Sequence, residues 1–456
     1  MQRTLTTETI EKVGQRVLLE GWVERVRTHG KLVFLDLRDR KGLIQVVVNA
    51  QVSQEAFNVG TELKPEDAVG LVGIVNKRPE RAINKEIKTG IVEIEAKEMK
   101  ILSKAKTLPF DMTKKELKLE LPTLFDHRSL TLKHPKQQEI FKVQEAIADA
   151  FREAAKKLDC TEIFIPTIAA SATEGGAEVF RVNYYGFPAY LTQSPQLYKQ
   201  IMAGVFERVY TIAHAYRAEP SVTTRHLTET VQMDCEIAFI NSFDELLDAL
   251  EFVGAYVISE AVKKYADAIL SFAKELPLVP DQIPRLKMRE AQEIIFKRTG
   301  RDVRSEKDLA PEDEKEIWLW AREEKKSDFV TVTHYPTKKR SFYTAPDPEN
   351  PEYSLSYDLI FKGVEILSGS QRINDYDELV KEIKERGLNP ADFSLYLQAF
   401  EYGMPPEGGF SFGLERITMK LLDLANVREA SLFPRDMERV DERLSVIQEK
   451  QQRKEK

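Results

Sequence analysis

The chain has 456 residues, of which 42% are hydrophobic and 31% charged, as in a soluble globular protein of about two domains. No apolar run reaches the roughly 18 residues that a membrane span needs, and the N-terminus has no apolar segment of the secretory kind. The two cysteines, Cys160 and Cys235, are expected to be reduced thiols of a cytoplasmic protein. The histidines are scattered and no CxxC pair occurs, so a structural zinc site has no support.

The net charge of −7 argues against a nucleic-acid partner for the chain as a whole, but the charge is unevenly distributed. Residues 1–110 hold 19 Lys and Arg against 15 Asp and Glu. Because cations neutralise phosphates, the N-terminal part is the better candidate for binding nucleic acid.

Residues 1–104 are predicted to form a small β domain. Short strands are expected at 17–23, 31–38, 43–48, 68–75 and 90–94, separated by Gly and charged turns. This pattern favours a five-stranded barrel of the OB type, with a β-sandwich as the alternative. Residues 105–132 are expected to be a linker, because Pro109 and Pro122 break helices there.

Residues 133–456 are predicted to form an α+β domain. Apolar residues step by three or four from 140 to 158, which indicates an amphipathic helix. Strands are expected at 161–168, 209–215, 230–240, 329–333 and 357–366. Helices are expected at 242–264, 288–299, 312–325, 376–386 and 413–424. Because strands and helices do not alternate regularly, an antiparallel sheet flanked by helices is favoured over a doubly wound parallel sheet.

A first cluster of polar residues lies at 216–227. Arg217 and Arg225 flank a short loop between two expected strands, and a guanidinium suits a phosphate because its planar fork donates two bonds. Glu219 could accept a hydrogen bond from an adenine amino group. Taken alone, the segment is better explained as a hairpin bearing surface ion pairs.

Two further clusters follow. Asp358, Glu365 and Ser368 offer hard oxygen ligands suited to Mg²⁺, although on one strand the two carboxylates would face opposite sides unless a bulge intervenes. The run from Gly408 to Arg416 is expected to open a helix whose N-terminus favours anions.

Together with residues 138–168, these clusters make the chain resemble class II aminoacyl-tRNA synthetases, in the subgroup of aspartyl, asparaginyl and lysyl enzymes. Residues 138–168 resemble motif 1, the dimer-forming element, whereas 208–240 resemble motif 2 and 408–436 resemble motif 3. With the barrel, the resemblance covers nearly the whole chain. It implies a homodimer that uses ATP with Mg²⁺.

Within this subgroup, three segments of the chain are similar to the aspartyl enzymes: residues 172–176, 193–200 and 368–373. The similarity implies that Lys199 and Arg372 hold the side-chain carboxylate of L-aspartate and that Glu174 reads its amino group. Asparagine would then leave two buried cations unpaired, which we expect to cost about 3–5 kcal/mol. The residues implied to bind aspartate are Glu174, Gln196, Lys199, Arg217, Ser368 and Arg372.

The same resemblance assigns the nucleotide site. Arg217 is implied to contact the α-phosphate and Arg416 the γ-phosphate, and these two are the implied catalytic residues. Glu365 and Ser368 are the implied Mg²⁺ ligands, with Asp358 as a weaker third. The residues implied to bind ATP are Arg217, Glu219, Arg225, His226, Leu227, Glu365, Gly413, Leu414, Glu415 and Arg416.

The barrel is implied to read the tRNA anticodon through Arg27, Phe34 and Gln45, because single-stranded RNA is recognised by stacking and by bonds to base edges. The short spacing between Arg217 and Arg416 resembles the archaeal and eukaryotic aspartyl enzymes, many of which charge both tRNA(Asp) and tRNA(Asn). The alternatives are an asparaginyl-tRNA synthetase, an asparagine synthetase using the same adenylate, and a non-catalytic RNA-binding relative. Glu24 holds a barrel position that the family links to anticodon choice, without deciding the specificity.

Overall fold

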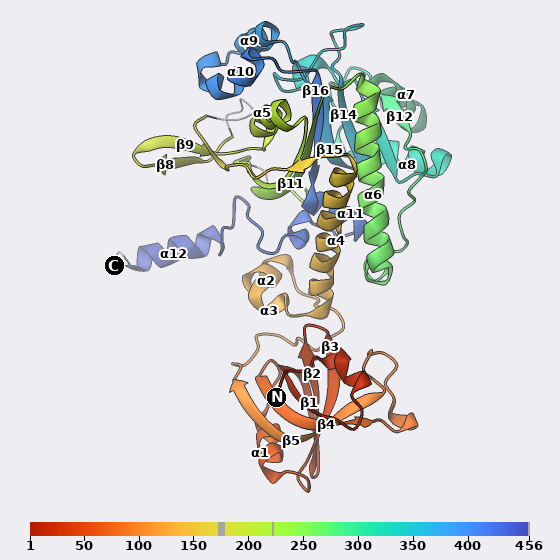
Figure 1. The fold of residues 1–456 in the computed structure, drawn as a ribbon, viewed down its shortest axis with the longest axis vertical. Coiled ribbons are helices and arrows are strands. Elements are labelled where there is room, and N and C mark those ends of the chain that lie inside the picture. Colours follow the sequence, from red (N-terminus) through yellow and green to blue (C-terminus); the bar gives the residue numbers. More distant parts are fainter. Residues whose placement is uncertain (172–177, 221–222, 455–456) are drawn as a thin grey trace. The chain divides into compact units, whose positions relative to one another are not determined.

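The computed structural model describes residues 1–171, 178–220 and 223–454. The chain divides into two compact units, Met1–Lys118 and Leu119–Lys456 (Figure 1). The division falls inside the segment expected to be a linker, whose second half contains the short helices α2 (Leu121–Asp126) and α3 (Arg128–Thr131). In the part of the chain described here, no helix is long and apolar enough to cross a bilayer.

The first unit is a closed barrel with the strand order β1-β2-β3-β5-β4. Strictly alternating side chains fill it: Val33, Leu35 and Leu37 are fully buried, whereas Phe34 between them is half-buried on the outer face. The predicted five-stranded OB barrel is confirmed, and the sandwich alternative is wrong. Its elements are η1 (Thr6–Glu11), β1 (Arg16–His29), β2 (Leu32–Asp39), β3 (Gly42–Asn49), α1 (Gln54–Glu62), β4 (Ala68–Lys77), η2 (Glu80–Ala82) and β5 (Val92–Ser103).

The second unit is built on an eight-stranded sheet. Its order is β12 (Arg285–Lys287), β13 (Phe329–Thr333), β14 (Ser356–Phe361), β15 (Val364–Gln371), β16 (Glu407–Gly413), β11 (Glu229–Ala238), β10 (Arg208–Tyr216) and β6 (Thr161–Glu162). The central pairs are antiparallel as expected. At the two edges of the sheet, β12 pairs in parallel with β13, and β6 pairs in parallel with β10. Parallel pairing needs a long crossover, which α7 and α8 supply between β12 and β13.

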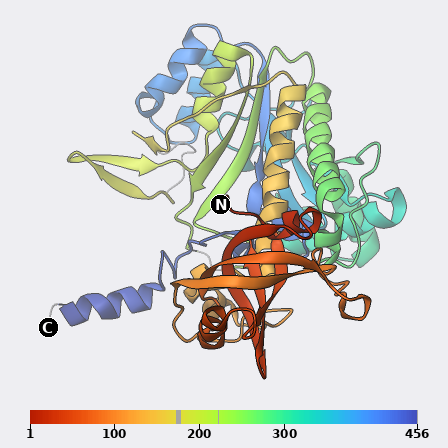
Figure 2. The same cartoon turned by 60° about the horizontal axis from the view of Figure 1, so that its bottom comes forward.

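Helices α4 (Pro135–Lys157) and α6 (Phe243–Leu270) lie side by side against one face of this sheet (Figures 1 and 2). The remaining elements are a small sheet of β7 (Ile168–Ala169), β9 (Phe187–Leu191) and β8 (Arg181–Tyr184), helices α5 (Gln196–Phe206), α7 (Met288–Thr299), α8 (Pro311–Lys325), α9 (Tyr376–Glu385), α10 (Ser394–Glu401), α11 (Leu414–Leu421) and α12 (Leu444–Lys454), and the 3₁₀ turns η3 (Thr337–Lys339), η4 (Pro390–Phe393) and η5 (Val427–Ala430).

The central strands have one apolar and one polar face. On β11, Met233, Cys235 and Ile237 are buried in the core with α4 and α6. The alternate residues Asp234 and Glu236 therefore project from the opposite face, since successive side chains of a strand point to opposite sides. That polar face carries the candidate site.

Three sequence predictions were wrong in detail. The segment 357–366 is the hairpin β14–β15 and not one strand, because Lys362 and Gly363 both have positive φ (47° and 75°) and make a two-residue turn. The segment 161–168 is interrupted before Pro166 and contributes to two sheets. The glycine-rich run is strand β16, and helix α11 begins only at Leu414 and ends at Leu421.

Two glycines of β16, Gly408 and Gly409, serve close packing of strands. A Cβ on Gly409 would stand 2.1 Å from a carboxylate oxygen of Glu236 and 2.2 Å from the carbonyl oxygen of Cys235. No larger residue fits there, so these glycines are explained without an anion.

Candidate active site

The three sequence clusters meet at one cavity of about 260 Å³ on the polar face of the sheet. Leu414 does not line it, because its side chain packs in the hydrophobic core. Every other residue predicted to bind ATP does. The lining residues are Arg217, Glu219, Arg225, His226, Leu227, Thr230, Gln232, Glu365, Ile366, Ser368, Ser411, Gly413, Glu415, Arg416 and Val427.

Cations and carboxylates alternate around this cavity. Glu219 lies 3.9 Å from Nη1 of Arg217 and 3.8 Å from Nε2 of His226. Arg416 donates to the carbonyl oxygen of Glu365 at 3.2 Å and lies 3.6 Å from its carboxylate. The cavity thus holds arginines that can bind a polyphosphate together with acidic groups that can bind a cation.

Glu365 is an acidic group of this cavity with a strongly altered pKa. Burial and the nearby Asp358 carboxylate raise the pKa of Glu365 to about 7. The β14–β15 hairpin, with a bulge after Leu359, explains why the two carboxylates interact although they are seven residues apart. Asp358 itself lines neither this cavity nor the neighbouring one, and its Oδ2 accepts from Nη2 of Arg340 at 2.7 Å.

Of the three predicted magnesium ligands, Glu365 and Ser368 line the cavity, whereas Asp358 does not. Within residues 1–171, 178–220 and 223–454, no three His, Cys, Asp or Glu side chains are grouped as a metal site. Glu365 and Ser368 do face the cavity together, and the repulsion that raises the pKa of Glu365 would be relieved by a bound cation. The hard oxygens available fit Mg²⁺ if phosphate oxygens complete its coordination.

A second cavity of about 160 Å³ adjoins the first and shares Arg217, Gln232, Ser368 and Ser411 with it. Gln196, Lys199, Arg217, Ser368 and Arg372, which are the described residues predicted to bind aspartate, all line it. The predicted residue Glu174 lies outside the described residues. A ligand occupying both cavities would cross their common wall at Arg217 and Ser368.

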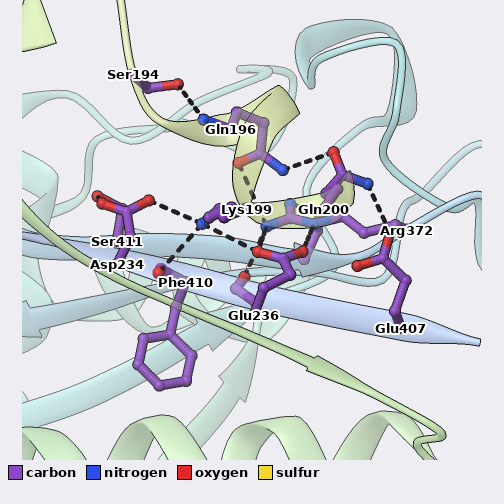
Figure 3. Close-up of polar contacts among 12 residues, drawn as sticks. Ser194, Gln196, Lys199, Gln200, Asp234, Glu236, Arg372, Glu407, Phe410 and Ser411 are labelled. Carbon is purple, nitrogen blue, oxygen red and sulfur yellow. Dashed lines mark hydrogen bonds and ion pairs between the residues drawn. The ribbon is translucent and has the colours of Figure 1, made fainter. Parts of the chain in front are cut away.

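Lys199 and Arg372 converge at the floor of the second cavity, as the resemblance implied (Figure 3). Nζ of Lys199 lies 2.8 Å from Asp234 and 3.0 Å from Glu236. Nε of Arg372 lies 2.7 Å from the other carboxylate oxygen of Glu236. Both cations are thus held by one internal carboxylate, and α5, β11 and β15 meet there.

This pairing overturns the expectation that asparagine would leave two unpaired cations in the site. Burial disfavours the charged ammonium, but Asp234 and Glu236 outweigh that effect and raise the pKa of Lys199. Burial likewise opposes ionisation of Glu236, but the two cations lower its pKa. With two internal carboxylates against two cations, the pocket floor is close to neutral, and the 3–5 kcal/mol argument does not hold.

A second polar layer lies behind the cations (Figure 3). Gln196 donates to Gln200 at 2.8 Å, and Gln200 donates to Glu407 at 2.7 Å. Burial and the charge of Glu236 raise the pKa of Glu407 well above its ordinary value, which favours the protonated form of this carboxyl. This layer fixes Gln196 from behind, and Gln196 in turn lies 3.5 Å from Arg372.

Sequence reasoning missed Asp234, Glu236 and Glu407. The alternation of polar and apolar residues from Gln232 to Ile237 was a usable signal, since it predicts a strand with carboxylates on one face. Arg340 was also missed, and it lines the second cavity, donates to Ser368 at 3.3 Å and stacks 3.9 Å over the Tyr335 ring. No local pattern marks Arg340.

On the barrel, the three residues predicted to contact the anticodon share one outer surface. Arg27 on β1 is the direct cross-strand partner of Phe34 on β2. Gln45 on β3 pairs with Asp36, which is two residues from Phe34 and so on the same face. Phe34 is half-buried beside His29, with the ring centroids 6.2 Å apart, and is not a residue of the barrel core.

Comparison with known proteins agrees with this geometry. Residues 120–437 match the family described as tRNA synthetases class II (D, K and N), and residues 17–102 match the OB-fold nucleic acid binding domain. The chain is 40% identical to the aspartate–tRNA(Asp) ligase of Pyrococcus horikoshii over 95% of its own length and 97% of that protein. It is also 40% identical to the aspartate–tRNA(Asp/Asn) ligase of Thermus thermophilus, over 96% and 99%.

Two solved structures have the same fold. Asparaginyl-tRNA synthetase from Pyrococcus horikoshii, complexed with asparaginyl-adenylate, superposes with a TM-score of 0.88 at 30% identity over 96% of this chain and 99% of that one. Aspartyl-tRNA synthetase from Entamoeba histolytica superposes with a TM-score of 0.84 at 29% identity over 96% and 93%.

The chain therefore belongs to the class II aminoacyl-tRNA synthetases of the aspartyl, lysyl and asparaginyl subgroup. Relatives that match at 37–40% identity over nearly the whole chain are aspartate ligases. Its activity is that of an aspartate–tRNA ligase, which consumes ATP and loads aspartate onto tRNA(Asp).

Proposed function

We propose that the two adjoining cavities bind ATP and L-aspartate so that aspartyl-adenylate forms at their common wall. The aspartate α-carboxylate would attack the α-phosphate and release pyrophosphate, with Arg217 stabilising the charge at that phosphorus and Arg416 holding the γ-phosphate. The shared position of Arg217 in both cavities is the observation that carries the proposal. Such a reaction needs no protein nucleophile, because positioning and fixed charges supply the catalysis.

Recognition of aspartate would occur at the pocket floor. Its side-chain carboxylate would bind beside Lys199 and Arg372, both of which also contact Glu236. Gln196 would add a neutral contact, and Glu174 is proposed from the family resemblance alone. Since the floor is nearly neutral before aspartate enters, its selectivity comes from the direction of these donors and not from excess charge.

Magnesium would join the nucleotide to the protein. Glu365 and Ser368 would hold Mg²⁺ against the phosphates, and the ion would neutralise charge on the departing pyrophosphate. Asp358 would be a weaker third ligand, since its Oδ2 already accepts from the Arg340 guanidinium.

Aspartate-dependent exchange of pyrophosphate into ATP tests the adenylation site. Arg217→Ala should reduce the exchange rate at least about a hundredfold, as expected for loss of one charge that stabilises a transition state. Arg304→Ala, which removes an exposed arginine paired with Asp302, is the control and should leave exchange unchanged. Near-normal exchange in the Arg217 variant would refute the assignment.

We further propose that the barrel binds the anticodon of tRNA, with Phe34 stacking on a base and Gln45 and Arg27 bonding to its edge. The common outer face of these residues supports this role. The relatives at 37–40% identity include ligases named for tRNA(Asp) and ligases named for both tRNA(Asp) and tRNA(Asn). Charging assays on separate tRNA(Asp) and tRNA(Asn) transcripts decide between the two specificities.

Finally, we propose that the active enzyme is a homodimer. Three aromatic side chains of the motif 1 region and the β8–β9 hairpin are largely exposed, Phe164 at 90%, Tyr185 at 89% and Phe187 at 74%, and an apolar cavity of about 600 Å³ adjoins Phe187. Exposed apolar groups gathered in this way are typical of protein–protein interfaces.

Light scattering coupled to size-exclusion chromatography tests the dimer. Phe187→Asp should shift the protein toward the mass of one chain, whereas Tyr402→Asp, at an exposed aromatic of α10's C-terminus, should not. A wild-type protein that is monomeric at micromolar concentration would contradict the proposal.

A further inference from the structure

Helix α8 lies outside the three signature motifs and contacts two residues that line the nucleotide cavity, Arg225 and Glu365. Its first turn contains Glu314, and its apolar residues Ile317 and Ala321 are buried in a core shared with strand β13. The helix therefore has little freedom to move relative to the sheet. A side chain placed on such a packed element is held more precisely than one on a loop.

One oxygen of Glu314 accepts two hydrogen bonds that belong to different parts of the site. Oε2 accepts from Nη1 of Arg225 at 3.1 Å and from the backbone N–H of Glu365 at 3.1 Å. Arg225 lies in the motif 2 loop, and Glu365 is the predicted magnesium ligand on β15. Their side chains come from segments separated by 140 residues of chain, so Glu314 is a bridge between them.

The β14–β15 turn also contacts Arg225 and helix α8. Nη2 of Arg225 donates to the carbonyl oxygen of Gly363 at 3.4 Å. A Cβ on Gly363 would stand 3.1 Å from Cα of Lys315, so the turn lies directly against the first turn of α8. Arg225 is consequently held at both Nη atoms, which fixes the direction of its planar face and of its remaining N–H groups.

Glu365 is fixed along its backbone by the same arrangement. Its N–H donates to Glu314, and its carbonyl oxygen accepts from Arg416 at 3.2 Å. Arg416 comes from motif 3, so the strand segment carrying Glu365 lies between α8 and α11. The backbone position from which the Glu365 carboxylate projects is therefore fixed.

We propose that Glu314 is a positioning residue for the nucleotide, one that orients Arg225 and Glu365 and thereby sets the affinity for ATP without touching the substrate. Its Glu314–Arg225 ion pair is only 13% and 26% exposed, which preserves its strength against solvent screening. The inference rests on the proposed nucleotide site, since it gains meaning only if Arg225 contacts ATP.

The test is Glu314→Gln, which keeps an acceptor oxygen for both donors but removes the charge. In aspartate-dependent pyrophosphate exchange, we expect the KM for ATP to rise about fivefold to tenfold, the difference between a charge-assisted and a neutral hydrogen bond. The KM for aspartate and the Tm should stay as in the wild type. Glu312→Gln, which removes a carboxylate paired with Arg301 on the exposed side of the same turn, is the matched control.

Arg225→Ala separates this inference from the proposed function. If that variant leaves the KM for ATP unchanged, the nucleotide site itself is wrong. If it raises the KM but Glu314→Gln does not, or if Glu314→Gln lowers it, Glu314 does not position Arg225 and the inference fails. If the inference holds, adding Glu314→Gln to the Arg225→Ala background should raise the KM for ATP by a smaller factor than it does in the wild type.

A second substitution guards against a folding defect. Glu314→Asp retains the charge but is one methylene shorter, so it cannot reach both donors from the same backbone position. We expect a similar rise in the KM for ATP with an unchanged Tm. A lowered Tm in both Glu314 variants, together with equal rises in the KM values for ATP and for aspartate, would show that Glu314 has a structural role and would overturn the proposal.

Discussion

Replacing Lys199 by Met separates the cost of the buried network from the binding of aspartate. In the wild type, the ammonium is 1% exposed and lies 2.8 Å from Asp234 and 3.0 Å from Glu236. In the variant, Glu236 keeps Arg372, but Asp234 keeps only the hydroxyl of Ser411 at 2.7 Å.

One buried carboxylate is then left without a counter-charge, which costs about 3–5 kcal/mol. For a unit of this size, we expect the Tm to fall on the order of 10 °C. Aspartate-dependent pyrophosphate exchange should be lost, because the cation proposed to hold the substrate carboxylate is gone.

The double variant Lys199→Met/Asp234→Asn removes the orphaned charge together with the cation. We expect thermal denaturation to return close to the wild-type Tm while pyrophosphate exchange stays absent. Recovery of both properties would mean that Lys199 has only a structural role. An unchanged Tm in the single variant would show that the ion pair does not stabilise the fold, and the reasoning from burial would then be wrong.

Three further predictions follow from the barrel, the sheet and the second polar layer. Phe34→Ala should weaken tRNA charging and spare pyrophosphate exchange. Gly409→Ala should destabilise the catalytic unit by about 3 kcal/mol or more, because its Cβ would overlap the adjacent strand. Gly60→Ala in α1 should instead stabilise the barrel by about 0.5 kcal/mol, because its Cβ would lie in ordinary contact, 3.6 Å from Val33. Glu407→Gln should flatten the dependence of unfolding free energy on pH above pH 4.5.

The sign of the last prediction follows from the raised pKa of Glu407. The folded protein keeps a proton that the unfolded chain releases above its ordinary pKa of 4.5, so that stabilisation is complete below pH 4.5 and is lost as the pH rises toward the folded pKa. Urea unfolding at several pH values measures it, and an equal slope in the wild type and Glu407→Gln would contradict it. For Phe34→Ala, parallel losses of charging and exchange would refute separate roles for the two units. Tolerance of Ala at Gly409 would refute the close-packing explanation.

Much of the fold was predictable because its signals are local. Strict alternation from residue 32 to 37 gave the barrel strands, and apolar spacing gave helix α7 at its observed bounds. The hairpin turn at Lys362 and Gly363 was overlooked, although a glycine between two apolar runs is a turn signal. The parallel edges of the sheet carry no local signal, since they depend on long crossovers.

Only those residues of the candidate site that lie in or near a sequence motif were predictable. Arg217, Lys199 and Arg416 were found through their neighbours in sequence. Glu314 and Arg340 act through partners that only folding brings near, such as the motif 2 loop 89 residues from Glu314. The pairing of the pocket cations with internal carboxylates could not be foreseen from charge counts, because which carboxylates face inward is decided by strand register.

The wall shared by the two cavities also bears on inhibition. Since Arg217 and Ser368 border both compartments, a single molecule can fill them without a flexible spacer. A stable compound that joins an aspartyl group to an adenosine group through a non-cleavable linkage would lose translational freedom once instead of twice. Its affinity should approach the product of the affinities of its two halves, and a lengthened linker should forfeit that gain.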